Sequence, residues 1–440
     1  MESDLTRIRN KAGSEPKLRF TSLYHHVTDK GGLLSSYEQI EPGASPGVDG
    51  VTKDKYGEEL ESNLEDLSER LGRMGYRPQP VRRAYIAKAG SDKKRPLGVP
   101  TVEDKVVQMA VTRVLSAIYE ADFRDCSYGY RPKRGCHDAL GALGRTIQQK
   151  KVNWIVEADI RGFFDHVNHE WLMKFLELRI GDPRVLRLIR RMLKAGVMED
   201  GLVRDTGEGT PQGAILSPLL SNVYLHYVLD LWFEGRFRGQ CSGEAYLFRY
   251  ADDFVVCFQY EDEARRFLTA LKDRLEQFHL EVEPSKTKMI RFGRFVRQDG
   301  HELETFDFLG FTHHCGQTSR GSFKLQRRTS QKKFRAKLRD ITAWIRNGRH
   351  EAKAGLLLRQ AKRRLQGHLN YYAITDNRRG CQSFRSQFER SLFKWLNRRS
   401  QRDSYTWEQF ANALDWVGWP SIRIRGHLDP FRRVGLNNQC

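Results

Sequence analysis

Two adjacent carboxylates are the residues of this sequence best suited to chemistry. Asp252 and Asp253 lie between two short apolar runs, residues 246–249 and 255–258, and this pattern predicts the tight turn of a β-hairpin. Carboxylates that are half desolvated at such a turn repel each other, and a hard divalent cation would neutralise them. An Asp-Asp pair alone is more often a solvated turn, so a metal site requires a third acid nearby.

Asp159 is the candidate for that third acid. It ends the apolar run of residues 154–158, which predicts a strand, and from the end of a neighbouring strand it could face the hairpin tip. Three acids around two Mg²⁺ ions suit nucleotidyl transfer, because one ion activates the attacking oxygen and the other steadies the leaving pyrophosphate.

An ordered series of short motifs accompanies these acids. The series runs Asp159-Ile-Arg-Gly-Phe-Phe-Asp165, Gly209-Thr-Pro-Gln-Gly213, Tyr250-Ala-Asp-Asp253, Pro284-Ser-Lys-Thr-Lys288 and Phe308-Leu-Gly-Phe311. This succession closely resembles the palm motifs of reverse transcriptases, in particular those encoded by bacterial group II introns. Because the resemblance covers nearly the whole chain, it is far more specific than any single motif.

The resemblance implies an α+β fold of the right-hand polymerase type. We expect an N-terminal extension of the fingers (residues 1–75), fingers (76–155), a palm with an antiparallel sheet (156–315) and an all-helical basic thumb, or maturase domain (316–440). The implied metal site holds two Mg²⁺ ions, for which Mn²⁺ can substitute. Its expected members are Asp159, Ile160, Asp252 and Asp253, with the three acids as the catalytic residues.

Four residues are expected to contact the incoming dNTP. Lys88 and Arg95 lie on a predicted hairpin that resembles the fingers hairpin of the family, where such cations hold the triphosphate; a solvated basic face is the alternative. Phe164, five residues after Asp159, would clash with a ribose 2′-OH in polymerases of this class, although plain core packing would also explain it. Gln212 could hydrogen-bond a base or sugar edge near the new base pair.

Other residues are candidates for contact with the nucleic acid itself. The loop of residues 127–136 could either stack on nucleic acid or form a packed corner, and Gly213 would let a strand approach the backbone closely. The thumb helices would grip the duplex by its phosphates. The full candidate set is Arg131, Arg134, Gly213, Lys286, Arg327, Arg328, Arg363, Arg364, Arg398 and Arg399.

The positive charge of the chain is concentrated at its C-terminal end. The 440 residues carry a net charge of +20, and residues 316–440 contain 28 Lys and Arg against 8 Asp and Glu, whereas residues 1–315 contain 47 of each sign. An excess confined to one region implies a bound polyanion, RNA or DNA, whose phosphate contacts salt would weaken.

Composition also limits the setting of the protein. No apolar run approaches the roughly 20 residues that span a bilayer, so we expect a cytoplasmic protein that does not bind membranes. The seven cysteines form no Cys-x-x-Cys pair, so neither a disulfide framework nor a zinc module is expected. Among proteins of the family that the chain resembles, we expect a member that lacks the HNH nuclease of many relatives.

These expectations combine into an RNA-directed DNA polymerase of a group II intron. Its partners would be the intron RNA, an RNA template with a DNA or RNA primer, the target DNA and dNTPs, and it would assist splicing and retrohoming. Two alternatives remain open: a maturase that acts mainly as an RNA-binding splicing factor, and a domesticated reverse transcriptase used in defence or DNA repair.

Overall fold

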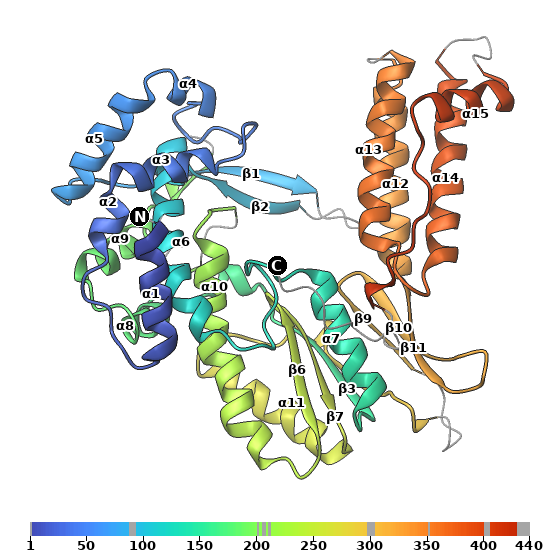
Figure 1. Ribbon diagram of the computed structural model, residues 1–440, viewed down its shortest axis with the longest axis horizontal. Helices are drawn as coiled ribbons and strands as arrows, with labels where there is room; N and C mark the ends of the chain where they lie inside the picture. Colours follow the sequence, from blue (N-terminus) through green and yellow to red (C-terminus); the bar gives the residue numbers. More distant parts are fainter. Residues whose placement is uncertain are drawn as a thin grey trace.

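The computed structural model describes residues 2–87, 94–199, 202–204, 208–209, 213–296, 304–350, 353–399 and 405–428. Helices gather at one end of the molecule, sheets occupy its middle, and a second group of helices stands at the other end (Figure 1). Among these residues no helix is long and apolar enough to cross a membrane.

The N-terminal helices pack around one long helix. The long helix α6 runs from Val102 to Asp122, and Thr101 caps it by accepting a hydrogen bond from the backbone N–H of Asp104. The helices around it share one buried apolar core with α6. They are α1 (Glu2–Ser14), α2 (Tyr24–Thr28), α3 (Lys30–Glu38), α4 (Lys53–Gly57) and α5 (Leu60–Gly72).

The predicted basic hairpin is confirmed by its two strands, β1 (Val81–Ala87) and β2 (Lys94–Val99), which pair antiparallel. A second hairpin, formed by β4 (Val197–Glu199) and β5 (Leu202–Arg204), joins it in a sheet with the order β2-β1-β4-β5. Strands β1 and β4 are parallel and lie far apart in the sequence, so local patterns gave no sign of this pairing.

A second sheet has the order β6-β7-β3-β8, with every neighbouring pair antiparallel. Its strands are β3 (Trp154–Asp159), β6 (Ala245–Tyr250), β7 (Asp253–Phe258) and β8 (Lys288–Arg291). Because side chains alternate along a strand, β7 contributes Phe254 and Val256 to one core and Val255 and Cys257 to another. Buried on both faces, these strands hold the ends of β3 and β7 rigidly.

Helices cover both faces of this sheet. On one face lie α10 (Ser217–Leu225) and α11 (Glu261–Glu276), with α8 (His169–Glu177) packed on α10 and α9 (Pro183–Leu193) packed on α8, and on the other face lies α7 (Cys136–Gln149). The apolar pattern of residues 214–229 predicts a helix after the Gly209–Gly213 motif. Helix α10 begins three residues later, at Ser217, and continues as a π-helical turn, His226–Asp230. A further π-helical turn follows at Phe233–Phe237, and 3₁₀ turns occur at Phe163–Asp165, Arg238–Gln240, Pro284–Lys286 and Gly426–Leu428.

The C-terminal part begins with a third sheet, in the order β11-β10-β9, before its helices. The strands are β9 (Thr305–Phe308), β10 (Phe311–Gln317) and β11 (Phe323–Thr329), so the expected domain boundary at residue 316 falls inside β10, and residues 323–328 form a strand rather than the start of a helical domain. The helices α12 (Gln331–Gly348), α13 (Ala354–Tyr372) and α14 (Arg378–Leu396) stand side by side above this sheet, with α15 (Trp407–Trp416) at their far end (Figure 1). They share their own apolar core.

Candidate active site

The three acids singled out in the sequence meet at one edge of the central sheet. Asp159, the last residue of β3, is the register partner of Asp253, the first residue of β7. Asp252 lies in the turn between β6 and β7, where Ala251 has a φ of 57°, as the first central residue of a type II′ turn does. The predicted hairpin and the adjacency of Asp159 to its tip are therefore confirmed, whereas metal binding by these acids stays a prediction.

Crowding raises the pKa values of two of these carboxyl groups. Desolvation, followed by the charges of Asp252 and Asp159, raises the pKa of Asp253 to about 7. Desolvation also raises the pKa of Asp252; a backbone hydrogen bond opposes it, the charge of Asp159 adds to it, and the charges of Arg95 and Lys286 lower the pKa by less. The Asp253 side chain still meets solvent, so water screens part of its interaction with its neighbours. A cluster of acids that resists ionisation is one that a cation would stabilise.

The ammonium group of Lys286 forms an ion pair with Asp159. Burial lowers the pKa of Lys286, but the contacts with Asp159 outweigh it and raise the value overall. As the side chains stand, no group of three or more His, Cys, Asp or Glu in the described ranges is arranged to hold a metal ion. The donor set nevertheless fits a hard cation, because it consists of carboxylate oxygens and already attracts a positive charge. Ile160, the other expected member, is buried just beyond β3.

The expected dNTP contacts are only partly within the described ranges. Phe164 is half-buried and packs edge-on against the buried Phe163 at a centroid distance of 5.4 Å. This position is compatible both with core packing and with contact to a sugar. Arg95 is exposed on β2, and its charge lowers the pKa of Asp252. The basic hairpin therefore lies close enough to the acids to act on them electrostatically. Lys88 and Gln212 lie outside the described residues.

Gly213 packs tightly against the basic hairpin. Its φ is 106° and a Cβ atom there would come within 3.0 Å of the Gly98 carbonyl oxygen. Because a left-handed backbone and this close contact both favour glycine, packing on the protein explains Gly213 without any nucleic acid. Contact with nucleic acid stays a prediction for this exposed residue.

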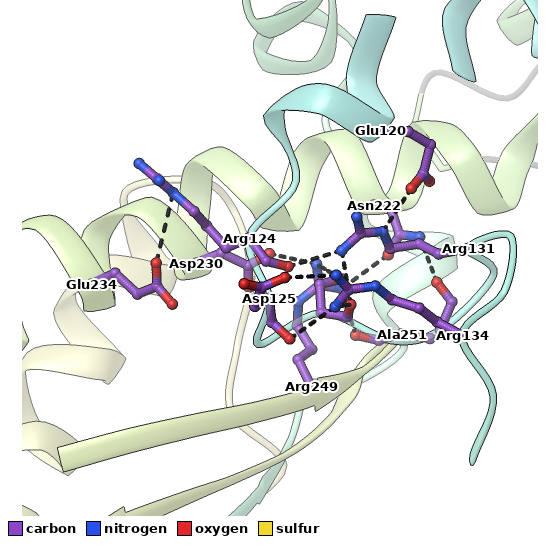
Figure 2. A network of polar contacts seen from close by, with 12 residues as sticks. Glu120, Arg124, Asp125, Arg131, Arg134, Asn222, Asp230, Glu234, Arg249 and Ala251 are labelled. Atoms are coloured by element: carbon purple, nitrogen blue, oxygen red, sulfur yellow. Dashed lines mark hydrogen bonds and ion pairs between the residues drawn. The ribbon is translucent and has the colours of Figure 1, made fainter. Parts of the chain in front are cut away.

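Two of the arginines expected to bind nucleic acid are buried, and this prediction was wrong for them. The Arg131 guanidinium donates to Glu120 at 3.0 Å and to the carbonyl oxygens of Arg124 and Ser127, so it stabilises a packed corner (Figure 2). Arg327 is 0% exposed and donates to the carbonyl oxygens of Leu140 and Leu428. Neither side chain can reach a phosphate without losing these partners and exposing the corner it fills.

The remaining cationic candidates keep some access to solvent. Arg134 is half-buried and pairs with Asp125 at 2.6 Å. Lys286 pairs with Asp159, and its expected contact with nucleic acid stays a prediction. The others lie on or beside the C-terminal helices with exposed or half-buried side chains: Arg328, Arg363, Arg364, Arg398 and Arg399.

A cationic groove on the C-terminal helices was not anticipated from the sequence. Its volume is about 830 Å³, and the indole ring of Trp395 forms part of its wall. The Trp395 Nε1–H is buried with no hydrogen-bond partner, and the guanidinium of Arg349 lies 5.2 Å from the ring centroid. The charged residues of the groove are Lys332, Arg335, Arg339 and Arg346. The sequence signal was present as cations spaced three and four residues apart along α12, which places them on one face.

The raised pKa of Asp253 predicts a pH-dependent stability of the metal-free protein. An unfolded Asp has a pKa of about 3.9, so between about pH 4 and pH 7 the folded state binds more protons and its stability falls as the pH rises. Asp253→Asn removes the ionisable group. In EDTA, its melting temperature should therefore exceed that of the wild type by an amount that grows from pH 5 to pH 8, measured by differential scanning fluorimetry. An equal difference at both pH values would contradict the shift.

The ordered motifs, the sheet and the converging acids are those of a polymerase that transfers nucleotides. Comparison with known proteins identifies the family of polymerases. Residues 86–313 match the family model described as reverse transcriptase (RNA-dependent DNA polymerase), and the chain belongs to this family. The family resemblance found in the sequence is thereby confirmed.

Individual relatives place the chain nearer to one branch of the family. It is 41% identical over 231 residues to the group II intron-encoded protein LtrA of Lactococcus lactis, a match covering 52% of this chain and 38% of LtrA. It is 35% identical over 281 residues to the protein YkfC of Escherichia coli K12, covering 57% of this chain and 74% of YkfC. A weaker similarity, 29% over 129 residues, relates it to the nuclear intron maturase 3 of Arabidopsis thaliana mitochondria, covering 29% of this chain and 18% of that protein.

Proposed function

We propose that this protein is a group II intron-type reverse transcriptase, which extends a primer on an RNA template by adding dNTPs. The observation that carries the proposal is the register of Asp159 opposite Asp253, with Asp252 in the adjoining turn, in a chain of this family. In the proposed architecture the β1/β2 hairpin belongs to the fingers, the β6-β7-β3-β8 sheet is the palm, and α12, α13 and α14 form the thumb.

Asp159, Asp252 and Asp253, with Ile160, would hold two Mg²⁺ ions, or Mn²⁺ in their place. When bound, such ions lower the barrier by activating the primer 3′-OH and by neutralising charge on the leaving pyrophosphate. The chain itself supplies the carboxylates and holds them at the ends of buried strands. Lys286, now paired with Asp159, would have to release this carboxylate as a cation binds.

The incoming dNTP would lie between the acids and the basic hairpin. Arg95, exposed on β2, and Lys88 would contact the triphosphate, because a guanidinium fork and an ammonium point charge both suit phosphate oxygens. Phe164 would lie under the sugar and Gln212 beside the nascent base pair.

A primer-extension assay tests this function directly. The purified protein, a DNA primer on an RNA template, dNTPs and Mg²⁺ should give extended DNA, and EDTA should abolish it. Extension on a DNA template only, or none on any template with Mg²⁺ or Mn²⁺, would contradict the proposal.

A second role, as a maturase that stabilises the fold of an intron RNA in the cytoplasm, is favoured by the cationic C-terminal helices. The printed name of one relative is that of an intron maturase. The two roles are compatible, since the palm would catalyse nucleotide addition and the thumb would bind the RNA. A splicing assay of the cognate intron at near-physiological Mg²⁺ tests the maturase role, because an unchanged splicing rate on adding protein would remove it. Use of target DNA in retrohoming is a separate expectation, which that assay leaves as it stands.

The groove on α12 predicts a salt-dependent contribution to RNA binding. Arg335→Ala with Arg339→Ala removes two exposed cations. The plot of log K against log salt has a negative slope, and the variant should reduce its magnitude by roughly 1.5, since each phosphate contact contributes about 0.7–0.9. Filter binding between 50 and 300 mM KCl measures the slope. The matched control, Arg265→Ala with Lys272→Ala, removes two exposed cations from α11 and should leave it unchanged; equal effects would mean that the groove has no special role.

A further inference from the structure

A fully buried ion pair lies directly behind the turn that carries Asp252. Arg249, near the end of β6, and Asp230, in the π-helical turn after α10, are both 0% exposed. They pair through two bonds, from Nε to Oδ1 at 2.7 Å and from Nη2 to Oδ2 at 2.6 Å. A buried pair of this kind contributes little net stability, because removing two charges from water offsets their attraction. Its position beside the turn suggests a different contribution.

The remaining donors of Arg249 reach the turn and its surroundings (Figure 2). Nη1 donates to the carbonyl oxygen of Ala251 and to Oδ1 of Asn222, both at 3.0 Å, and Nη2 donates to Oγ of Ser127 at 2.7 Å. With the two bonds to Asp230, all five N–H donors of the guanidinium are used. Since each bond has a fixed direction, the group can occupy only one orientation.

The bond to Ala251 acts at the least favourable point of the turn. Ala251 has a φ of 57°, a left-handed conformation that non-glycine residues adopt only when their surroundings impose it. Its carbonyl belongs to the peptide that links it to Asp252. Fixing this carbonyl therefore fixes the plane from which the Asp252 side chain departs.

A second contact holds the turn from the side of residues 126–129. The Asn222 side chain donates to the Gly129 carbonyl at 2.7 Å, and backbone hydrogen bonds join Arg249 to Cys126 and to Tyr128. Gly129 lies so close to the turn that a Cβ atom would come within 2.5 Å of the Ala251 nitrogen. The turn is thus clamped between the guanidinium and a glycine.

We propose that Arg249 is a positioning residue for the polymerase reaction: held by Asp230 and Asn222, it fixes the Ala251–Asp252 peptide so that Asp252 can share a cation with Asp159 and Asp253. This proposal rests on the proposed function. It extends that function by assigning a role to side chains that touch neither substrate nor cation, and by explaining why a costly buried ion pair lies at this place in the fold.

Arg249→Lys tests the proposal because it keeps the positive charge and removes the planar guanidinium group with its five N–H donors. Its kcat should fall about 100-fold, as expected for a reacting geometry displaced by about an ångström, while the KM for dNTP stays within about twofold of the wild type, since no triphosphate contact is lost. Mn²⁺ affinity of the protein without substrate, measured by electron paramagnetic resonance, should weaken by about tenfold or more, as on loss of an outer-shell partner of a metal ligand.

The matched control is Arg179→Lys. Arg179 is also a buried arginine paired with an aspartate, Asp122 at 2.9 Å, and it bonds the carbonyl oxygens of Ala12, Glu15 and Leu18 far from the turn. This variant should lose a similar amount of thermal stability while keeping kcat and Mn²⁺ affinity within about twofold, because its partners hold no metal ligand.

A second variant covers the case in which Arg249→Lys does not fold. Gly129→Ala leaves the ion pair intact but forces the turn to move, so kcat and Mn²⁺ affinity should fall in the same way. If the folded Arg249→Lys or, failing that, Gly129→Ala keeps both values near wild type, or if Arg179→Lys loses both equally, the positioning role is overturned. A wild type that does not extend primers would instead overturn the proposed function itself, so the two failures are distinguishable.

Discussion

A variant in which Asp252 and Asp253 are both alanine is expected to lose dNTP incorporation by about a thousandfold or more. Both residues lie at the tip of the β6/β7 hairpin, facing Asp159 at the end of β3. Without them the site would hold one carboxylate instead of three, and the stabilisation by several kcal/mol that bound divalent ions give to transferring phosphoryl groups would be lost. Single-nucleotide extension on an RNA template, followed over hours, measures the loss.

The same variant should bind RNA almost as well as the wild type. The C-terminal helices that carry the cationic groove have a separate apolar core and do not depend on the hairpin tip. Removing two repelling acids should not destabilise the palm, because the pKa values of both are already raised by crowding. The control Glu58→Ala with Glu59→Ala removes an exposed adjacent pair elsewhere and should keep full activity. Polymerisation by the Asp252/Asp253 variant at the wild-type rate would contradict the assignment of these acids.

Phe164→Ala is expected to reduce the preference for dNTP over rNTP by roughly 100-fold, the size of discrimination that one side chain of a shaped pocket typically provides. The ring lies five residues after Asp159, is half-buried and packs edge-on against Phe163. If it lies under the sugar, its removal opens space for a 2′-OH. The loss of preference should come from faster rNTP incorporation, with dNTP incorporation little changed. The ratio of kcat/KM for dNTP to kcat/KM for rNTP measures it.

Controls separate this role from core packing. Phe164→Tyr keeps the ring and should keep the selectivity. Phe163→Ala removes a ring that is 2% exposed, so it should cost about 3–5 kcal/mol of stability without admitting rNTPs. If Phe164→Ala lowers stability by a similar amount and leaves the substrate ratio unchanged, the ring belongs to the core alone.

Local patterns in the sequence were enough to predict the central part of the site. The β6/β7 hairpin follows from an apolar–turn–apolar pattern, and the placement of Asp159 beside it follows from a strand that ends in an acid. The 3.6-residue periodicity likewise predicts helices at residues 102–119, 264–278, 356–372 and 383–399, and α6, α11, α13 and α14 confirm them with ends that differ by up to five residues. These features depend on interactions between residues close in sequence or on one repeating pattern.

Features that depend on distant pairing were not predicted. The parallel pairing of β1 with β4, the separate sheet of β9, β10 and β11, and the π-helical turn that places Asp230 behind Arg249 are all decided by tertiary contacts. The same limit explains the errors at Arg131 and Arg327. Sequence shows that a residue is cationic but not whether its partner is a phosphate or a buried carbonyl, and both arginines proved to be internal.

The site also contains a contact that family motifs alone did not suggest. Lys286 lies in a segment recognised by its resemblance to a nucleic-acid-contacting motif, yet its ammonium pairs with Asp159. The pairing requires β8 to lie beside β3, which the sequence could not establish. The residues most informative about mechanism were therefore those whose neighbours come from distant parts of the chain.

The most direct test of the central claim is a crystal structure of the protein with an RNA template, a DNA primer lacking its 3′-OH, a dNTP and Mn²⁺. Anomalous difference maps should show two peaks between Asp159, Asp252 and Asp253, each within about 2.0–2.3 Å of carboxylate oxygens. An ordered dNTP and primer beside these three acids, with no anomalous peak at the carboxylates, would contradict it.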